Sequence, residues 1–200
     1  MEILTTRGRP REFDVDAALA TALHVFWTKG YEGTSLTDLT EAMGITRPSL
    51  YAAFGNKESL FRQAFDLYER EKLAYVGSAM KAPTAHGVAK HLLEGALETC
   101  SGQDQPRGCL RVIISTPCGS EAASLREEVV KRGRNVQAAL IDRMKQAAKN
   151  GDFDESVDAE ALTRYLIAVL QGMSVQAGAG ATRAELERVV ETTLTMWPGR

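Results

Sequence analysis

Apolar side chains recur three or four residues apart along nearly the whole chain, in segments separated by glycine and proline. Residues at this spacing share one face of a helix, so the pattern predicts amphipathic helices rather than strands. The longer segments lie at about residues 15–29, 57–80, 88–100, 125–149, 158–176 and 184–197, and two short ones lie within 34–54.

Residues 109–116 are rich in β-branched side chains, which by propensity alone favour a strand. We expect a short buried helix there, because no second strand-like segment is present to pair with it. The predicted fold class is therefore all-α, with about nine helices. We expect an N-terminal three-helix unit over residues 1–56, a connecting helix over 57–80 and a C-terminal helical unit over 81–200.

The two short segments within 34–54 carry the most informative pattern. Ser35 and Asp38 form a capping box at the start of the first segment, and an apolar stripe follows at i, i+3 and i+7. Gly44 can take the positive φ that reverses the chain, and Thr46 is a suitable N-cap for the second segment. Two short helices joined by such a turn are the pattern of a helix-turn-helix that reads DNA.

The second short helix predicts which side chains would face the DNA. Leu50 and Phe54 lie on its inner face, which leaves Arg47, Ser49 and Tyr51 pointing outward. A guanidinium, a hydroxyl and a phenol suit base edges and phosphates. For Tyr51 the alternative is a partly buried packing role, and for Arg47 it is an ordinary solvated arginine.

Composition and charge add little to this picture. The chain has 44 % hydrophobic and 25 % charged residues and a formal net charge of −2, so no global basic field indicates nucleic acid. Counterion release needs only cations that face phosphate, and the basic side chains of the first 62 residues gather mainly in the N-terminal tail and around the second short helix. The N-terminus is polar, no apolar run is long enough to cross a membrane, and the cysteines number three. We therefore expect a reduced, cytoplasmic setting and no membrane partner.

The N-terminal third resembles the TetR/AcrR family of bacterial transcription regulators. The residues that carry the resemblance lie between Phe13 and about Arg70, and are Ala18, Phe26, Gly30-Tyr31, Thr34-Ser35, Leu39, Met43-Gly44-Ile45, Leu50-Tyr51, Phe54, Lys57 and Leu60. The rest of the chain is similar only in being helical and of suitable length. The resemblance implies a DNA-binding regulator that needs no cofactor.

The resemblance also implies roles for individual residues. Thr34 and Ser35 would offer hydroxyls and backbone N–H groups to phosphate, with capping alone as the competing role. Thr46, Ser49 and Tyr51 would hold phosphates, Arg47 would enter the major groove, and Lys57 would meet a phosphate at a helix N-terminus. In the tail, Arg9 belongs to Arg7-Gly8-Arg9-Pro10, which looks like a minor-groove hook.

Two further implications concern the C-terminal unit. A short reading helix cannot specify a site alone, so we expect a homodimer that pairs through its last two helices and binds a palindromic operator in double-stranded DNA. We also expect a cavity for a small apolar or electrophilic effector that relieves repression. The candidate lining residues, for each of which a plain core role competes, are Leu93, Leu97, Cys109, Val112, Ile113, Leu166, Leu170 and Met173.

The cysteines support an alternative within the same class. The sequence Arg107-Gly108-Cys109 resembles a subset of the family that senses electrophiles or oxidants, and a neighbouring Arg107 or Arg111 would favour the thiolate. An inert packing role for Cys109 competes with this hypothesis.

Other classes find little support in the sequence. The spacing of the cysteines does not match a zinc site, and no catalytic motif supports an enzyme. A protein-interaction module that has lost DNA binding remains as a remote alternative, although such a module would have no reason to keep its outer face polar and basic.

Overall fold

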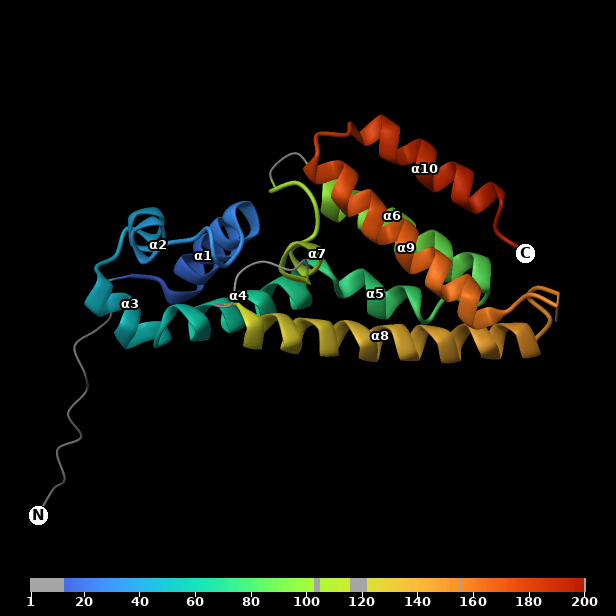
Figure 1. The fold of residues 1–200 in the computed structure, drawn as a ribbon, viewed down its shortest axis with the longest axis horizontal. Coiled ribbons are helices and arrows are strands. Elements are labelled where there is room, and N and C mark those ends of the chain that lie inside the picture. The colour runs from blue at the N-terminus through green and yellow to red at the C-terminus, as the bar shows by residue number, and fades with distance from the viewer. Residues whose placement is uncertain (1–12, 103–104, 116–121, 155, 200) are drawn as a thin grey trace, which may run out of the picture.

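The computed structural model describes residues 13–102, 105–115, 122–154 and 156–199, and every regular element in these ranges is a helix (Figure 1). The described residues form ten helices: α1 (Val15–Lys29), α2 (Leu36–Met43), α3 (Arg47–Phe54), α4 (Lys57–Lys72), α5 (Ala74–Ala79), α6 (Ala85–Ser101), α7 (Leu110–Ser115), α8 (Ala123–Lys149), α9 (Ala159–Gly178) and α10 (Arg183–Thr195). The all-α prediction is confirmed, and residues 109–116 contain the short helix α7 rather than a strand. No helix in the described ranges is both long and apolar enough to cross a membrane.

The N-terminal half packs α1 to α4 around a core of aromatic rings. The Phe26 and Phe61 ring centroids lie 5.1 Å apart and the rings meet edge to face, as do those of Trp27 and Tyr68 at 4.9 Å. All four side chains are at most 2 % exposed. Such ring pairs contribute beyond their buried area, which makes this half a tightly filled unit.

The expected single helix over 57–80 is wrong, because the chain breaks at Leu73 between α4 and α5. Leu73 has φ −107° and ψ 10°, outside helical values. The Lys72 carbonyl accepts a hydrogen bond from Thr99 Oγ1 at 3.1 Å instead of continuing the helix. The break also seats the Tyr75 ring against α6 at Gly95, where a Cβ would come within 2.2 Å of the ring. This break accounts for the tenth helix.

The C-terminal half stacks α6, α9 and α10, with α5 and α8 along one side (Figure 1). Its core is built mainly from alanine, leucine and methionine, such as Ala89, Leu93, Leu166 and Met173. The long helix α8 starts beside α4 and ends near the far end of this half (Figure 1).

The two halves share packing residues at their boundary. Leu110 and Ile114 of α7, with Leu125 of α8, are buried in the aromatic core of the N-terminal half although they come late in the sequence. Tyr75 and Cys109 pack against both cores. A displacement at this boundary is therefore felt by both halves.

Candidate nucleic-acid interface and internal cavity

The first helix of the helix-turn-helix is fixed by the expected capping box. The Asp38 backbone N–H donates to Ser35 Oγ at 3.0 Å, and the Ser35 N–H donates to the Asp38 carboxylate at 2.8 Å. Lys29 of α1 also reaches this carboxylate at 2.5 Å. These hydrogen bonds, that of Lys29 first, hold the pKa of Asp38 well below its usual range. Gly44 ends α2 with φ 64°, in the left-handed region that the turn requires.

The second helix presents a polar outer face. Thr46 is the N-cap of α3 and accepts from the Ser49 N–H at 3.3 Å, and the two hydroxyls lie 2.9 Å apart. Arg47 is exposed, and its Nη2 donates to Thr37 Oγ1 at 2.9 Å, which joins α3 to the first turn of α2. Tyr51 is 48 % exposed, so its ring is not a core residue.

Lys57 begins α4 beside this face. Its ammonium lies 4.2 Å from the centroid of the Tyr31 ring, where a cation–π contact orients it. Asn56 caps the same helix and accepts from the Ser59 N–H at 2.8 Å. Lys57 thus stands at a helix N-terminus, where anions are favoured.

We call this set the reading surface: Ser35, Thr46, Arg47, Ser49, Tyr51 and Lys57. Thr34 differs from expectation, because its side chain is 1 % exposed and its hydroxyl donates to the Gly30 carbonyl at 2.6 Å. That hydroxyl closes the C-terminal end of α1 and is not presented to a phosphate. Arg9 and the rest of the tail motif lie outside the described residues.

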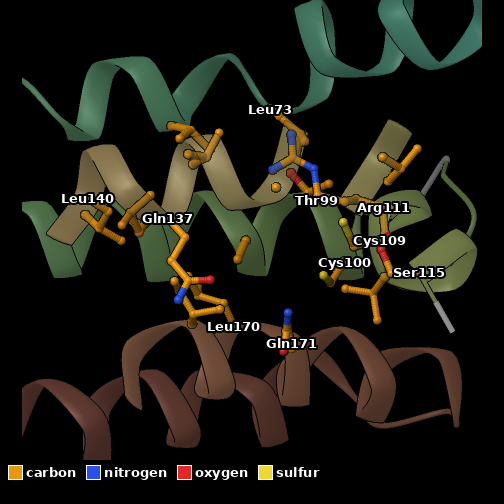
Figure 2. Close-up of a pocket in the computed structure, with 18 of the residues that line it drawn as sticks. Leu73, Thr99, Cys100, Cys109, Arg111, Ser115, Gln137, Leu140, Leu170 and Gln171 are labelled. Carbon is orange, nitrogen blue, oxygen red and sulfur yellow. Dashed lines mark hydrogen bonds between the residues drawn. The ribbon is translucent and has the colours of Figure 1, made fainter. Parts of the chain in front are cut away.

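A cavity of about 570 Å³ lies where the two halves meet, enclosed by α5, α6, α7, α8 and α9. Its volume is in the range of about 300–1,000 Å³ typical of small-molecule sites. Figure 2 shows Cys100, Cys109, Arg111 and Ser115 at one end and Leu140 towards the other.

Three of the eight expected lining residues, Cys109, Val112 and Leu170, line this cavity. The other five lie outside its lining, and these are Leu93, Leu97, Ile113, Leu166 and Met173. They follow the same helical stripes, but their side chains fill the cores instead of facing the void.

Cys109 is held from both halves of the molecule. Tyr68 Oη of α4 donates to its Sγ at 3.0 Å, and its own backbone N–H donates to Ser174 Oγ of α9 at 2.7 Å. One residue earlier, the Gly108 carbonyl accepts from Trp27 Nε1 of α1 at 3.0 Å. Gly108 has φ 87°, and a Cβ there would lie 3.1 Å from the Ser174 carbonyl oxygen, so the position requires glycine.

A second thiol and two phenols near Cys109 are held neutral by burial. Burial, with the nearby Cys109, raises the pKa of the Cys100 thiol to about 12. Burial also raises the pKa of both Tyr68 and Tyr75 well above the usual value for a phenol. Cys118, the third cysteine, lies outside the described residues.

With this geometry in hand, comparison with known proteins decides the family. Residues 18–64 match the profile "Bacterial regulatory proteins, tetR family", and residues 89–193 match "Tetracyclin repressor-like, C-terminal domain". The chain belongs to the TetR family. It is a DNA-binding transcriptional regulator and not an enzyme.

Several TetR-family proteins are similar along nearly their whole length. The HTH-type transcriptional repressor ComR of Escherichia coli (strain K12) is 36 % identical over 200 residues, which cover 96 % of this chain and 93 % of ComR. YezE of Bacillus subtilis (strain 168), an uncharacterized HTH-type regulator, is 31 % identical over 164 residues, covering 80 % of this chain and 83 % of YezE. A cysteine-substituted form of the TetR family regulator CifR, solved with 26-bp double-strand operator DNA, superimposes with a TM-score of 0.87 at 38 % identity, covering 96 % of this chain and all of that one.

Sequence reasoning missed the contacts that join the TetR-type reading unit to the cavity. Trp27, Tyr68 and Ser174 each bond to residue 108 or 109 from elements remote in sequence. The sequence shows an indole, a phenol and a hydroxyl within amphipathic helices but does not indicate which groups they bond to. These hydrogen bonds are therefore visible only in the folded structure. Among the described residues no cluster of His, Cys, Asp or Glu is arranged to hold a metal ion.

Proposed function

We propose that this regulator is a homodimeric repressor that binds an operator through its reading surface and is released when a small molecule fills the cavity. The observation that carries the proposal is the place of the cavity. Tyr75 and Cys109 line it and also pack against both hydrophobic cores, so an occupant acts on the DNA-reading half directly. A coupling free energy of about 1–3 kcal/mol is enough to change operator affinity about 5- to 150-fold.

In the proposed complex, Arg47 enters the major groove, while the hydroxyls of Ser35, Thr46 and Ser49 contact phosphate. Tyr51 and Lys57 complete the phosphate contacts on either side of α3. Support comes from the exposure of Arg47 and Tyr51 on α3, a helix that contains no acidic residue. The similar CifR structure was solved with operator DNA, which agrees with a DNA-binding role for the same fold.

Fluorescence anisotropy with a labelled duplex from the gene's own upstream region tests the DNA-binding proposal. We expect saturable binding that weakens as salt rises, and a loss of about tenfold or more for Arg47→Ala. Arg70→Ala is the matched control, because Arg70 is 71 % exposed on the same half but pairs only loosely with Glu71 at 3.6 Å. Equal losses in both variants would show that general charge, not the reading surface, binds the DNA.

We propose that the dimer forms through α9 and α10. Tyr165 and Val175 on α9 are 43 % and 60 % exposed, and Met196 directly after α10 is 64 % exposed. Large apolar groups left on one pair of helices are typical of a protein–protein interface. Gly172 lies on the same part of α9 and permits close approach of a second copy.

Light scattering after size exclusion tests this interface. Tyr165→Asp places a charge in the proposed contact outside the cavity lining, and we expect a shift from dimer to monomer with loss of tight operator binding. Ala52→Asp, which places the same charge at an exposed position on α3, is the control. That control should stay dimeric while binding DNA less well. A dimeric Tyr165→Asp protein would place the interface elsewhere.

The thiol-sensing alternative is favoured by one specific observation. Cys109 lines the cavity and its Sγ accepts the Tyr68 hydrogen bond, whereas the raised pKa of Cys100 keeps that thiol protonated. Covalent modification of Cys109 would therefore break a contact to α4, the helix that follows the reading unit.

Iodoacetamide tests this alternative, since the Cys109 sulfur would form a bond to carbon as iodide leaves and the thiol proton goes to solvent. We expect modification at Cys109 but not at Cys100 by peptide mass spectrometry, with weaker operator binding, and we expect Cys109→Ser to keep its operator affinity after treatment. Modification that leaves operator affinity unchanged would exclude thiol control of DNA binding.

A further inference from the structure

The charged groups in the cavity wall are all of one sign. Among the described lining residues there are two arginines, Arg111 and Arg134, and no aspartate, glutamate or lysine. Most other lining side chains are apolar, such as Leu92 and Ile167. A site of this composition favours an occupant that is apolar along its body and carries negative charge at one point.

Arg111 has an unused donor at the α7 end of this cavity. Its Nη2 is ion-paired with Glu69 of α4, but its Nε is buried and has no hydrogen-bond acceptor among the described residues. Figure 2 shows the Arg111 side chain beside Leu73 and Thr99 at the end of the cavity opposite Leu140. The nearby Thr99 hydroxyl donates to backbone carbonyls at 2.9 and 3.1 Å and makes no hydrogen bond with Arg111 Nε. The guanidinium fork can take a second carboxylate beside the first.

We propose that the effector is an amphipathic carboxylate whose head group binds Arg111 and whose apolar tail extends towards Leu140. This inference rests on the proposed function only in placing the effector in this cavity. It differs from the apolar or electrophilic effector expected from the sequence by adding an anionic head group.

The same guanidinium offers a route to the DNA-reading half. The Glu69 carboxylate is shared by two arginines. Its Oε1 pairs with Arg111 of α7, and its Oε2 lies 2.8 Å from Nη1 of Arg132 on α8. A ligand carboxylate placed beside Glu69 on Arg111 would share the charge of that guanidinium and repel the Glu69 carboxylate, which keeps Arg132 as a partner. Binding would therefore loosen the α4–α7 contact without leaving a carboxylate unpaired.

Isothermal titration with octanoate and 1-octanol, which share a tail and differ in head group, tests the proposal. We expect octanoate to bind the wild-type protein about tenfold or more tighter than 1-octanol, because the charged head makes charge-assisted hydrogen bonds. Arg111→Gln should abolish this preference, and Arg134→Gln, on the exposed side of the lining, should retain it. Equal binding of the two probes, no binding of octanoate, or a preference that survives Arg111→Gln would overturn the proposal.

Glu69→Gln provides a second variant that leaves Arg111 in place. Removing the competing carboxylate should tighten octanoate binding several-fold and leave 1-octanol unchanged; unchanged octanoate affinity would contradict the competition. Operator binding measured without octanoate or 1-octanol distinguishes failure of the head-group inference from failure of the proposed DNA-binding function. If the duplex is bound normally but octanoate shows no preference, the head-group inference fails while the proposed DNA-binding function stands.

Discussion

The core of the DNA-reading half is filled with aromatic rings, whereas the core of the other half is built from small and flexible side chains around a cavity. Phe26, Phe61 and Phe65 meet one another at centroid distances of 5.1 and 6.0 Å. On the other side of the boundary, Ala96 and Leu92 face an unfilled volume of about 570 Å³. A tightly packed half can hold the reading surface in one geometry, while a hollow half can change shape at small cost. The difference indicates that the tightly packed half recognises DNA and that the half with the cavity responds to a ligand.

The largest effect should come from adding the same side-chain volume to each half. Ala64 of α4 is fully buried in the aromatic core, so Ala64→Leu should destabilise the protein by about 1–3 kcal/mol through overpacking. Ala96 of α6 is 4 % exposed and lines the cavity, so Ala96→Leu should be neutral or stabilise by about 0.5–2 kcal/mol. Urea denaturation measures both. Equal destabilisation by the two substitutions would mean that the hollow half is no more tolerant than the filled one.

An effect smaller than the difference between those two substitutions is expected from the bond that ties the halves together. Trp27→Phe removes the donor to the Gly108 carbonyl and should cost about 1–3 kcal/mol, because a buried acceptor loses its partner. Trp197→Phe is the matched control: Trp197 is also buried, but its Nε1 has no acceptor among the described residues. We expect the unfolding midpoint to fall further for Trp27→Phe. A larger loss for Trp197→Phe would show that ring volume, not the bond across the boundary, sets the cost.

The smallest effect should come from the ion pairs between α4 and α8. Glu128 of α8 accepts from Arg62 at 2.9 Å and from Arg132 at 2.6 Å, and these hydrogen bonds lower its pKa below the ordinary value of 4.5. A lowered pKa in the folded state stabilises the protein above that ordinary value, and the stabilisation is lost as pH falls through the lowered one. Glu128→Gln should therefore cost less than about 1 kcal/mol at neutral pH and nothing in strong acid.

Thermal melting from neutral to acidic pH measures this loss. Glu71→Gln is the control, since Glu71 is more exposed and, among the described residues, pairs with Arg70 alone, at 3.6 Å. A Glu128→Gln deficit that persists unchanged in strong acid would rule out ionic pairing as its cause.

The helix-turn-helix was predictable because its determinants are local. The Ser35–Asp38 capping box, the turn at Gly44 and the Thr46 cap each depend on residues within three positions, and the structure contains all of them. The family profile over residues 18–64 agrees with that prediction.

What the sequence did not reveal depends on residues that are far apart in it. The break at Leu73 is set by Thr99 and Gly95 of α6, and no local feature of residues 57–80 indicates it. The cavity was only partly predictable, because an apolar stripe indicates burial but not whether the buried side chain meets a neighbour or a void. Leu166 and Leu170 lie on the same stripe, yet only Leu170 lines the cavity.

The central claim is that the reading surface and the cavity form one coupled system, and hydrogen exchange with and without operator duplex tests it without a known effector. The account predicts that DNA slows exchange in α2 and α3 and also changes it at the remote cavity wall, in α5, α7 and residues 108–109. Exchange that changes only in α2, α3 and the start of α4 would show that the cavity is energetically separate from DNA binding, and would contradict the account.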